Sequence, residues 1–337
     1  MTSDFPSPKT GHPALVLAPM EGVTDAPMRA FLTERGGFNY CVAEFLRIND
    51  QALPGKVFRK HIPELRTPGC ATPAGIPVQI QLLGGNADAL AEGALEAIRC
   101  GARAIDLNFG CPAPTVNRHD GGATLLKFPH RIEAIVRAVR EAVPRSIPVS
   151  AKLRLGWDTM DAIHENAERA ARGGANWITI HGRTRMQAYQ PPAHWKPIGE
   201  VRRALGPEIP VIANGDIWTL EDLKRCREAT GCQHFMLGRP ALADPMLPLL
   251  AARELGLSSG PETLAPLPIE ASVWQPLIRR FVDLSLAASD GAHGEGYTVA
   301  RIKQWVRMSH KQRNLPWFDA VKTTKTLDEV YQVLSRH

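Results

Sequence analysis

The sequence predicts an α/β fold, a (β/α)8 TIM barrel followed by a small all-helical C-terminal domain. Three observations predict it. Short apolar segments alternate eight times with longer amphipathic segments, polar residues follow most of the apolar segments, and the last fifth of the chain shows only helical patterns. The length of 337 residues suits a barrel of about 250 residues with an appended domain.

The predicted strands are apolar runs rich in Val, Ile and Leu. They show little polar alternation, as expected of parallel strands that are buried on both faces. The eight runs are residues 14–20, 40–45, 77–83, 104–108, 148–155, 177–181, 210–214 and 234–237.

Amphipathic segments with apolar residues at helical spacing lie between these runs. Thr24 can cap the first helix, and the helix after the third strand ends at Gly101. An open, doubly wound sheet is the alternative fold, but it would need fewer units than eight in a row. The predicted helices are residues 24–35, 87–100, 131–143, 158–172, 197–205, 220–229 and 242–255.

The segments that interrupt this alternation suggest the domain boundaries. The proline-rich segment 50–76 is predicted to be an elaborated loop at the barrel mouth. We expect an N-terminal extension to which the sequence assigns no role, a catalytic barrel, a linker rich in Gly, Pro and Ser, and a helical domain. The boundaries are 1–13, 14–255, 256–269 and 270–337, with helices in the last domain at 270–288, 297–312 and 326–334.

Composition narrows the class of protein. Apolar residues make up 44% and charged residues 22%, which are ordinary values for a globular protein. The net charge is +6, and from Ala271 onward ten Lys and Arg residues stand against six Asp and Glu residues. Basic charge is therefore concentrated in the helical domain, which is compatible with a polyanionic partner.

Several other classes are not expected. None of the six cysteines forms a C-x-x-C pair, so we predict no metal site. The N-terminus lacks the apolar core of a signal peptide, and no apolar run is long enough for a membrane span. The sequence therefore predicts a cytoplasmic protein with reduced thiols and no membrane partner.

In TIM barrels the active site lies at the carboxyl ends of the strands, and the loops after the last two strands often bind phosphate. Here those loops begin with Asn214-Gly215 and Gly238-Arg239. Glycine allows backbone N–H groups to approach an anion, and arginine can bind it. The alternative is that both pairs are simple tight turns, but their occurrence at paired barrel positions favours a phosphate site.

Two further residues in predicted strands have open alternatives. Lys152 lies in a run that should be buried, where an ammonium group needs an anionic or electron-rich partner. That partner is either a reduced flavin or a carboxylate such as Asp106 or Glu44. His181 closes the sixth strand, and it either bonds to the backbone or contacts a cofactor ring.

Cys111 directly follows the fourth predicted strand, so it should lie on a loop at the barrel mouth. Most free cysteines are small buried apolar residues, and we expect this of Cys41, Cys100 and Cys232. A thiol with a pKa of about 8.5 is mostly protonated at neutral pH and can donate a proton. A nucleophilic role would need a lowered pKa and a nearby base, which the sequence does not show.

Taken together, these residues resemble the tRNA-dihydrouridine synthases. The matching motifs cover nearly the whole barrel in order, and the basic helical segment resembles the family's tRNA-binding domain. The motifs are APMEGVTD at 18–25, DLNFGCP at 106–112, KLR at 152–154, HGRT at 181–184, IANGD at 212–216 and Gly238-Arg239.

The resemblance implies a flavoprotein oxidoreductase that binds FMN and is reduced by NADPH. Hydride would pass from the flavin to C6 of uracil, Cys111 would protonate C5, and Asn108 would help to hold the base. The implied FMN-binding residues are Pro19, Met20, Glu21, Gln81, Lys152, His181, Asn214, Gly215, Asp216, Gly238 and Arg239.

Further motifs are similar to the branch of the family that acts at tRNA position 16. They are EFLR at 44–47, GGATLL at 121–126 and ARIKQW at 300–305. The chain departs from the family at Asp216, where some relatives have Glu, and at Met308, whose thioether offers little to RNA. We expect a monomer whose substrate and tRNA contacts are Arg47, Asn108, Arg154, Tyr189, Arg301, Lys303 and Lys322.

Two alternative functions follow from the same fold. A flavin barrel that acts on a free pyrimidine, as dihydroorotate dehydrogenases do, would not need the basic helical domain. A non-enzymatic RNA-binding barrel would be expected to lack Cys111 or Lys152, and both are present. A member of the same family that acts at another position of the D-loop is the remaining alternative.

Overall fold

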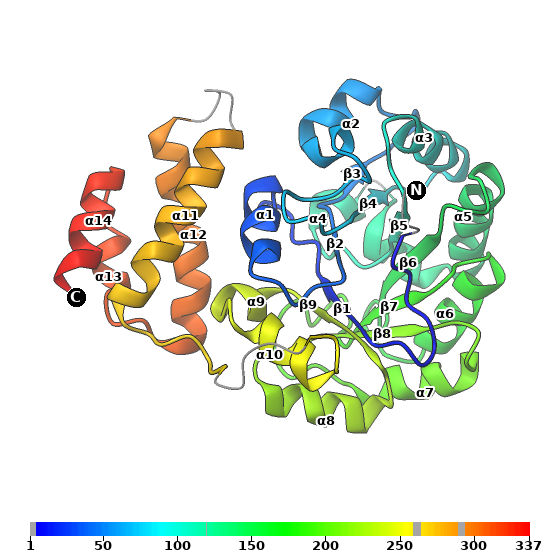
Figure 1. Ribbon diagram of the computed structural model, residues 1–337. Helices are drawn as coiled ribbons and strands as arrows, with labels where there is room; N and C mark the ends of the chain where they lie inside the picture. Colours follow the sequence, from blue (N-terminus) through cyan, green and yellow to red (C-terminus); the bar gives the residue numbers. More distant parts are fainter. Residues whose placement is uncertain (1–4, 119, 259–263, 289–293) are drawn as a thin grey trace.

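The computed structural model describes residues 5–118, 120–258, 264–288 and 294–337. Its centre is a closed barrel of parallel strands, which confirms the predicted fold class (Figure 1). The order is β2-β1-β9-β8-β7-β6-β5-β4-β3, and pairing of β2 with β4 closes the ring. The strands are β1 Ala14–Leu17, β2 Tyr40–Val42, β3 Leu46–Arg47, β4 Val78–Leu83, β5 Ile105–Asn108, β6 Val149–Arg154, β7 Ile178–His181, β8 Val211–Asn214 and β9 His234–Leu237.

Helices surround this barrel, and a separate group of helices follows it (Figure 1). Helices of the barrel bury one apolar stripe against the sheet, as in α5, where every fully buried side chain is Ile or Val. The barrel helices are α1 Ala26–Glu34, α2 Gly55–His61, α3 Ala87–Arg99, α4 Pro114–Asn117, α5 Pro129–Ala142, α6 Ile163–Arg172, α7 Lys196–Leu205, α8 Leu220–Thr230, α9 Arg239–Ala243 and α10 Leu247–Glu254. The C-terminal helices are α11 Ala271–Ala288, α12 Glu295–Arg313, α13 Phe318–Val321 and α14 Leu327–Arg336.

Three local predictions are wrong. Segment 50–76 is not a plain loop: it contains α2 and a 3₁₀ turn, because Phe58 is fully buried and anchors the helix. The helix predicted at 242–255 is broken into α9 and α10 at Asp244-Pro245, where the Asp244 carboxylate accepts the N–H groups of Met246 and Leu267. The helix predicted from residue 158 begins only at Ile163.

The first helix is also capped differently from the prediction. Asp25, not Thr24, is the N-cap, and its carboxylate accepts the N–H of Met28 at 3.1 Å. The Thr24 hydroxyl instead accepts the N–H of Met20 at 2.8 Å. Thr24 therefore holds the loop that follows β1 at the barrel mouth.

The C-terminal helices share a continuous apolar core with the barrel. Phe31 of α1 lies 4.9 Å from Trp305 and 6.1 Å from Phe281, measured between ring centroids. The indole N–H of Trp305 donates to the carbonyl of Leu242 in α9 at 3.0 Å. These contacts fix the helical group against α1 and α9. The boundary at 256–269 stays a prediction, and residues 259–263 of it lie outside the described residues.

Phe5, in the described part of the N-terminal extension, covers the end of the barrel opposite the strand carboxyl ends. The Phe5 ring lies 4.9 Å from Tyr40 and 6.2 Å from Trp177, and it stacks on the indole at an interplanar angle of 3°. Tyr40 begins β2 and Trp177 precedes β7, so both rings lie at the amino ends of the strands. The extension thus has a structural role that the sequence alone did not assign.

We predict that Phe5→Ala lowers the free energy of unfolding by about 2 kcal/mol, because it removes a partly buried ring and leaves a cavity against Tyr40 and Trp177. Urea-induced unfolding followed by circular dichroism measures the change. Phe128→Ala is the control, since the Phe128 side chain is 38% exposed. Equal effects of the two substitutions would contradict a role for Phe5 in closing the barrel.

Candidate active site

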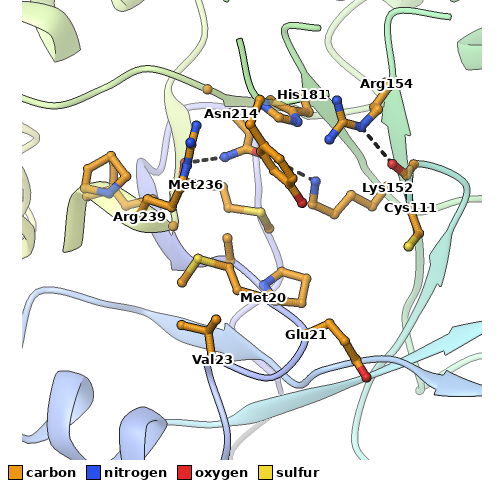
Figure 2. A pocket seen from close by; sticks show the side chains of 18 of the residues that line it. Met20, Glu21, Val23, Cys111, Lys152, Arg154, His181, Asn214, Met236 and Arg239 are labelled. Carbon is orange, nitrogen blue, oxygen red and sulfur yellow. Dashed lines mark hydrogen bonds between the residues drawn. The ribbon is translucent and has the colours of Figure 1, made fainter. Parts of the chain in front are cut away.

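A cavity of about 510 Å³ lies at the carboxyl ends of the strands (Figure 2). Loops from all around the barrel contribute to it, from the one after β1 to the one after β9. All eleven predicted cofactor-binding residues line the cavity, together with Asn108, Cys111, Arg154 and Tyr189. Four predicted tRNA contacts lie outside it: Arg47, Arg301, Lys303 and Lys322.

A chain of hydrogen bonds runs from the barrel interior to the Cys111 loop. The buried carboxylate of Asp106 accepts from the Ser150 hydroxyl at 2.5 Å and from Nε2 of Gln81 at 2.7 Å. Oε1 of Gln81 accepts from Nδ2 of Asn108 at 2.8 Å. Oδ1 of Asn108 then accepts the backbone N–H groups of Gly110 and Cys111 at 2.9 and 3.0 Å. The carboxylate thereby sets the orientation of both amides.

Arg154 holds the same loop from its other side. Its Nε donates to the carbonyl of Gly110 at 2.7 Å, and its Nη1 donates to the carbonyls of Thr184 and Ala188. The guanidinium is buried, which lowers the pKa of Arg154 to about 10. We predicted Arg154 as a substrate contact. The structure shows that it also positions the Cys111 loop.

Cys111 is the one partly exposed cysteine, and the other five are buried, as predicted for Cys41, Cys100 and Cys232. Its side chain lies at the edge of the cavity, with Lys152 and Arg154 close by and Met20 and Glu21 across from it (Figure 2). Burial raises the pKa of the Cys111 thiol above its ordinary value. The thiol therefore stays protonated at neutral pH and suits a proton donor rather than a nucleophile.

Lys152 makes no ion pair among the described residues, so the structure does not show the salt bridge to a carboxylate that was one alternative for this residue. Its Nζ donates to Oδ1 of Asn214 at 3.3 Å. Burial and the neighbouring Arg154 lower the pKa of Lys152, while the charge of Asp106 opposes this shift. Neither Asp106 nor Glu44 is a direct partner, so the ammonium group is available to an electron-rich ligand in the cavity.

His181 is held by a side chain rather than by the backbone. Arg183, fully buried, donates from Nη1 to Nε2 of His181 at 3.1 Å and forms an ion pair with Asp216 at 2.5 Å. Burial and the surrounding cations lower the pKa of His181 well below its usual value, so the ring is neutral. Because a guanidinium only donates, Nε2 is the acceptor and the proton lies on Nδ1.

The end of the cavity predicted to bind phosphate contains two glycines that are closely packed against other side chains, and one arginine that has no counter-ion among the described residues. A Cβ at Gly215 would lie 2.9 Å from His181, and one at Gly238 would lie 3.2 Å from Sδ of Met20. Gly215 also has φ of +121°, which disfavours a side chain. Arg239 makes no hydrogen bond or ion pair among the described residues, and its guanidinium lies over the rings of Tyr189 and Trp218.

A model of the family described as "Dihydrouridine synthase (Dus)" matches residues 16–326. This chain belongs to the dihydrouridine synthase family. It is therefore a flavin-dependent oxidoreductase. Members of the family generally use FMN and NAD(P)H.

Curated relatives support the same assignment. The chain is 44% identical to the tRNA-dihydrouridine(16) synthase of Pseudomonas putida, and the alignment covers 87% of each chain. It is 43% identical to the protein of that name in Neisseria meningitidis serogroup A, over 95% of this chain and 93% of the other. A histamine dehydrogenase from Rhizobium sp. 4-9 superposes with a TM-score of 0.56 at 14% identity, over 80% of this chain and 49% of that one, which shows the fold alone.

Two of the predicted tRNA contacts, Arg301 and Lys303, form hydrogen bonds with other residues of the protein. Arg301 is only 6% exposed, and its guanidinium pairs with Asp25 at 3.1 Å and donates to the carbonyls of Gly22 and Val23. Arg301 thus joins α12 to the loop after β1. Lys303 donates to the carbonyl of Thr324.

Sequence patterns alone missed four candidate functional residues, three of which shape this site. The sequence indicates Asp106 only as a possible partner of Lys152, and Arg183 only as part of the HGRT motif. Trp218 flanks Arg239, and Arg307 lines a basic hollow on the helical group. A polar residue inside an apolar run was the available signal for Asp106. Among the described residues, no cluster of His, Cys, Asp and Glu could hold a metal, and no helix could cross a membrane.

We predict that alkylation of Cys111 by iodoacetamide follows a titration whose apparent pKa lies above the ordinary value of about 8.5, because burial disfavours the thiolate. Mass spectrometry of the Cys111 peptide across pH 6–10 measures it, and Cys111→Ser serves as the blank for the buried cysteines. An apparent pKa below the ordinary value would instead indicate a nucleophile.

Proposed function

We propose that this chain reduces the C5–C6 double bond of uridine at position 16 in the D-loop of tRNA, with FMN as cofactor and NADPH as reductant. The observation that carries the proposal is the protonated Cys111 thiol at the edge of a cavity whose polar lining suits a flavin. The choice of position 16 rests on relatives of that name, which are 41–44% identical to this chain.

The cavity residues fit FMN in their chemistry. Arg239 lacks a counter-ion among the described residues and could bind a phosphate group, and Gly215 and Gly238 line the same part of the cavity. Lys152 offers a half-buried ammonium group that would stabilise the negative charge of a reduced flavin. Gln81 and Asn214 add polar side chains to the same wall. FMN would be held by the eleven residues predicted from the sequence.

Bound flavin supplies hydride for C6 of uracil and is restored by NADPH. The chain's own residues then have separate tasks. Lys152 stabilises negative charge, and Arg154 and Asn108 hold the loop that carries Cys111. The Cys111 thiol gives its proton to C5 of the base. Tyr189, 54% exposed beside the cavity, offers a ring face against which a base can stack.

Contacts with the rest of the tRNA are proposed for Arg47 and for a basic hollow on the helical group. The hollow is lined by Lys303, Arg307 and Lys322, among other residues of α12 and α13. Lys322 also pairs with Asp319, but both side chains are largely exposed, so that pair contributes little. We also propose a tRNA contact for Arg301, although most of its donors are used within the protein.

A second candidate, reduction of a free pyrimidine, has no specific observation in its favour. The family match covers residues 16–326 and so includes α11, α12 and α13 of the helical group, which that activity would not require.

The proposed function is tested by incubating the flavin-loaded protein and NADPH with tRNA that lacks dihydrouridine, followed by mapping of the modified positions. We expect dihydrouridine at position 16 and at no other D-loop uridine. A colourless preparation that cannot be reconstituted with FMN would overturn the cofactor assignment. Product at another position would retain the family activity and reject the assigned uridine.

We predict that Lys303→Ala combined with Arg307→Ala weakens tRNA binding and lowers the salt dependence of the affinity by about one to two units of log–log slope, because each phosphate contact releases condensed counter-ions. Filter binding across a series of salt concentrations measures the slope. Arg145→Ala is the control, since Arg145 is exposed at the other end of the barrel. An unchanged slope would assign the hollow a structural role.

Truncation after Pro268 is a poor test of tRNA binding by the helical group, because it would expose Phe31 of the barrel.

A further inference from the structure

A second cavity of about 700 Å³ opens beside the phosphate end of the central one. We call it the tryptophan cavity, because Trp195 and Trp218 line it, between the loops after β7 and β8 and the end of α12. Its volume lies in the range of small-molecule sites, about 300–1,000 Å³. The two cavities adjoin, since they share the lining residues Tyr189, Asp216, Trp218, Arg239, Met308 and Lys311.

The two indoles are fixed in place. The N–H of Trp195 donates to the carbonyl of Gly215 at 2.8 Å, and the N–H of Trp218 donates to Oδ1 of Asp216 at 3.3 Å. Their polar atoms are therefore satisfied within the protein, and their ring surfaces line the cavity. Such surfaces bind aromatic bases by stacking, with little dependence on base identity.

The cavity also carries an excess of positive charge. Four cations line it, Arg183, Arg225, Arg239 and Lys311, against two carboxylates. Both carboxylates are already paired, Asp216 with Arg183 and Asp222 with Arg225. Arg239 and Lys311 have no counter-ion among the described residues. The cavity thus offers two unpaired cations to an anionic ligand.

The other opening of the active site differs in charge. A cavity of about 840 Å³ also adjoins Cys111, and two cations, Arg47 and Arg185, line it against two carboxylates, Glu21 and Glu44. Neither carboxylate forms an ion pair among the described residues. This cavity therefore lacks the positive excess of the tryptophan cavity, and a ligand with several phosphates is favoured on the side of Lys311.

We propose that the tryptophan cavity binds the phosphorylated adenosine half of NADPH, with the nicotinamide reaching the central cavity. The inference rests on the proposed function, which requires a nicotinamide dinucleotide to reach the flavin. Trp195 and Trp218 provide aromatic surfaces for the adenine, and Lys311 meets its phosphates. FMN phosphate uses Arg239, which leaves Lys311 as the cation free for the second ligand. A uracil base and a nicotinamide would then occupy the central cavity in turn.

The test uses flavin-loaded protein and adenosine 2′,5′-bisphosphate, which is the phosphorylated half of NADPH without the nicotinamide. Calorimetric titration should show binding to the unaltered chain that is weaker by roughly tenfold in Lys311→Glu, as expected when a charge-assisted contact is lost. Lys311→Gln should give a smaller loss in the same direction. Arg145→Glu, the same charge change at the other end of the barrel, should leave the affinity unchanged.

Rapid mixing separates this proposal from the proposed function. At limiting NADPH concentration, Lys311→Glu should slow flavin reduction by a similar factor. The same substitution should slow reduction by NADH less. When the flavin is reduced with dithionite instead, the loss in single-turnover formation of dihydrouridine by the variant should be much smaller than its loss in reduction by NADPH. Slower turnover on tRNA with unchanged nucleotide binding would assign the cavity to tRNA and overturn the inference. Failure of the unaltered, flavin-loaded chain to modify tRNA would instead reject the proposed function.

Discussion

The active site depends on one constraint, which is that the buried carboxylate of Asp106 only accepts hydrogen bonds. Gln81 must therefore present its nitrogen to Asp106 and its oxygen to Asn108, and Asn108 must present its oxygen to the N–H groups of the Cys111 loop. The other end of this series of hydrogen bonds requires the same orientation of the two amides, because the backbone N–H groups of the Cys111 loop only donate. A side chain in the barrel interior thus determines where the thiol lies at the mouth.

The same carboxylate moderates the electrostatics of the cavity. Arg154 is buried and Lys152 half-buried in the same strand, and the charge of Asp106 favours the charged form of Lys152. Without it, burial would favour loss of the lysine proton. Burial and the cations together lower the pKa of His181 and keep its ring neutral, whereas at Cys111 the effect of burial outweighs that of the cations and raises the pKa of the thiol. The arrangement therefore separates a positive region for the flavin from a neutral acid for the substrate.

Much of this was predictable from local sequence. Buried parallel strands produce unbroken apolar runs, and the polar residue that ends each run, such as Asn108 or Asn214, faces the barrel mouth because all strands point the same way. Contacts between distant segments were not predictable. The stacking of Phe5 on Trp177 and the ion pair between Arg301 and Asp25 join residues far apart in the chain, and no local periodicity encodes these contacts. Helix α2 was missed because prolines flank a short apolar stretch whose burial depends on the neighbouring chain.

The central claim is that Cys111 acts as the proton donor after hydride transfer. It is tested most directly by separate half-reactions of Cys111→Ser, which keeps the shape of the side chain but is a much weaker acid. We expect NADPH to reduce the flavin of the variant at the normal rate, while dihydrouridine forms roughly 100-fold or more slowly, the usual contribution of a general acid. Formation of dihydrouridine at the normal rate by the variant would contradict it.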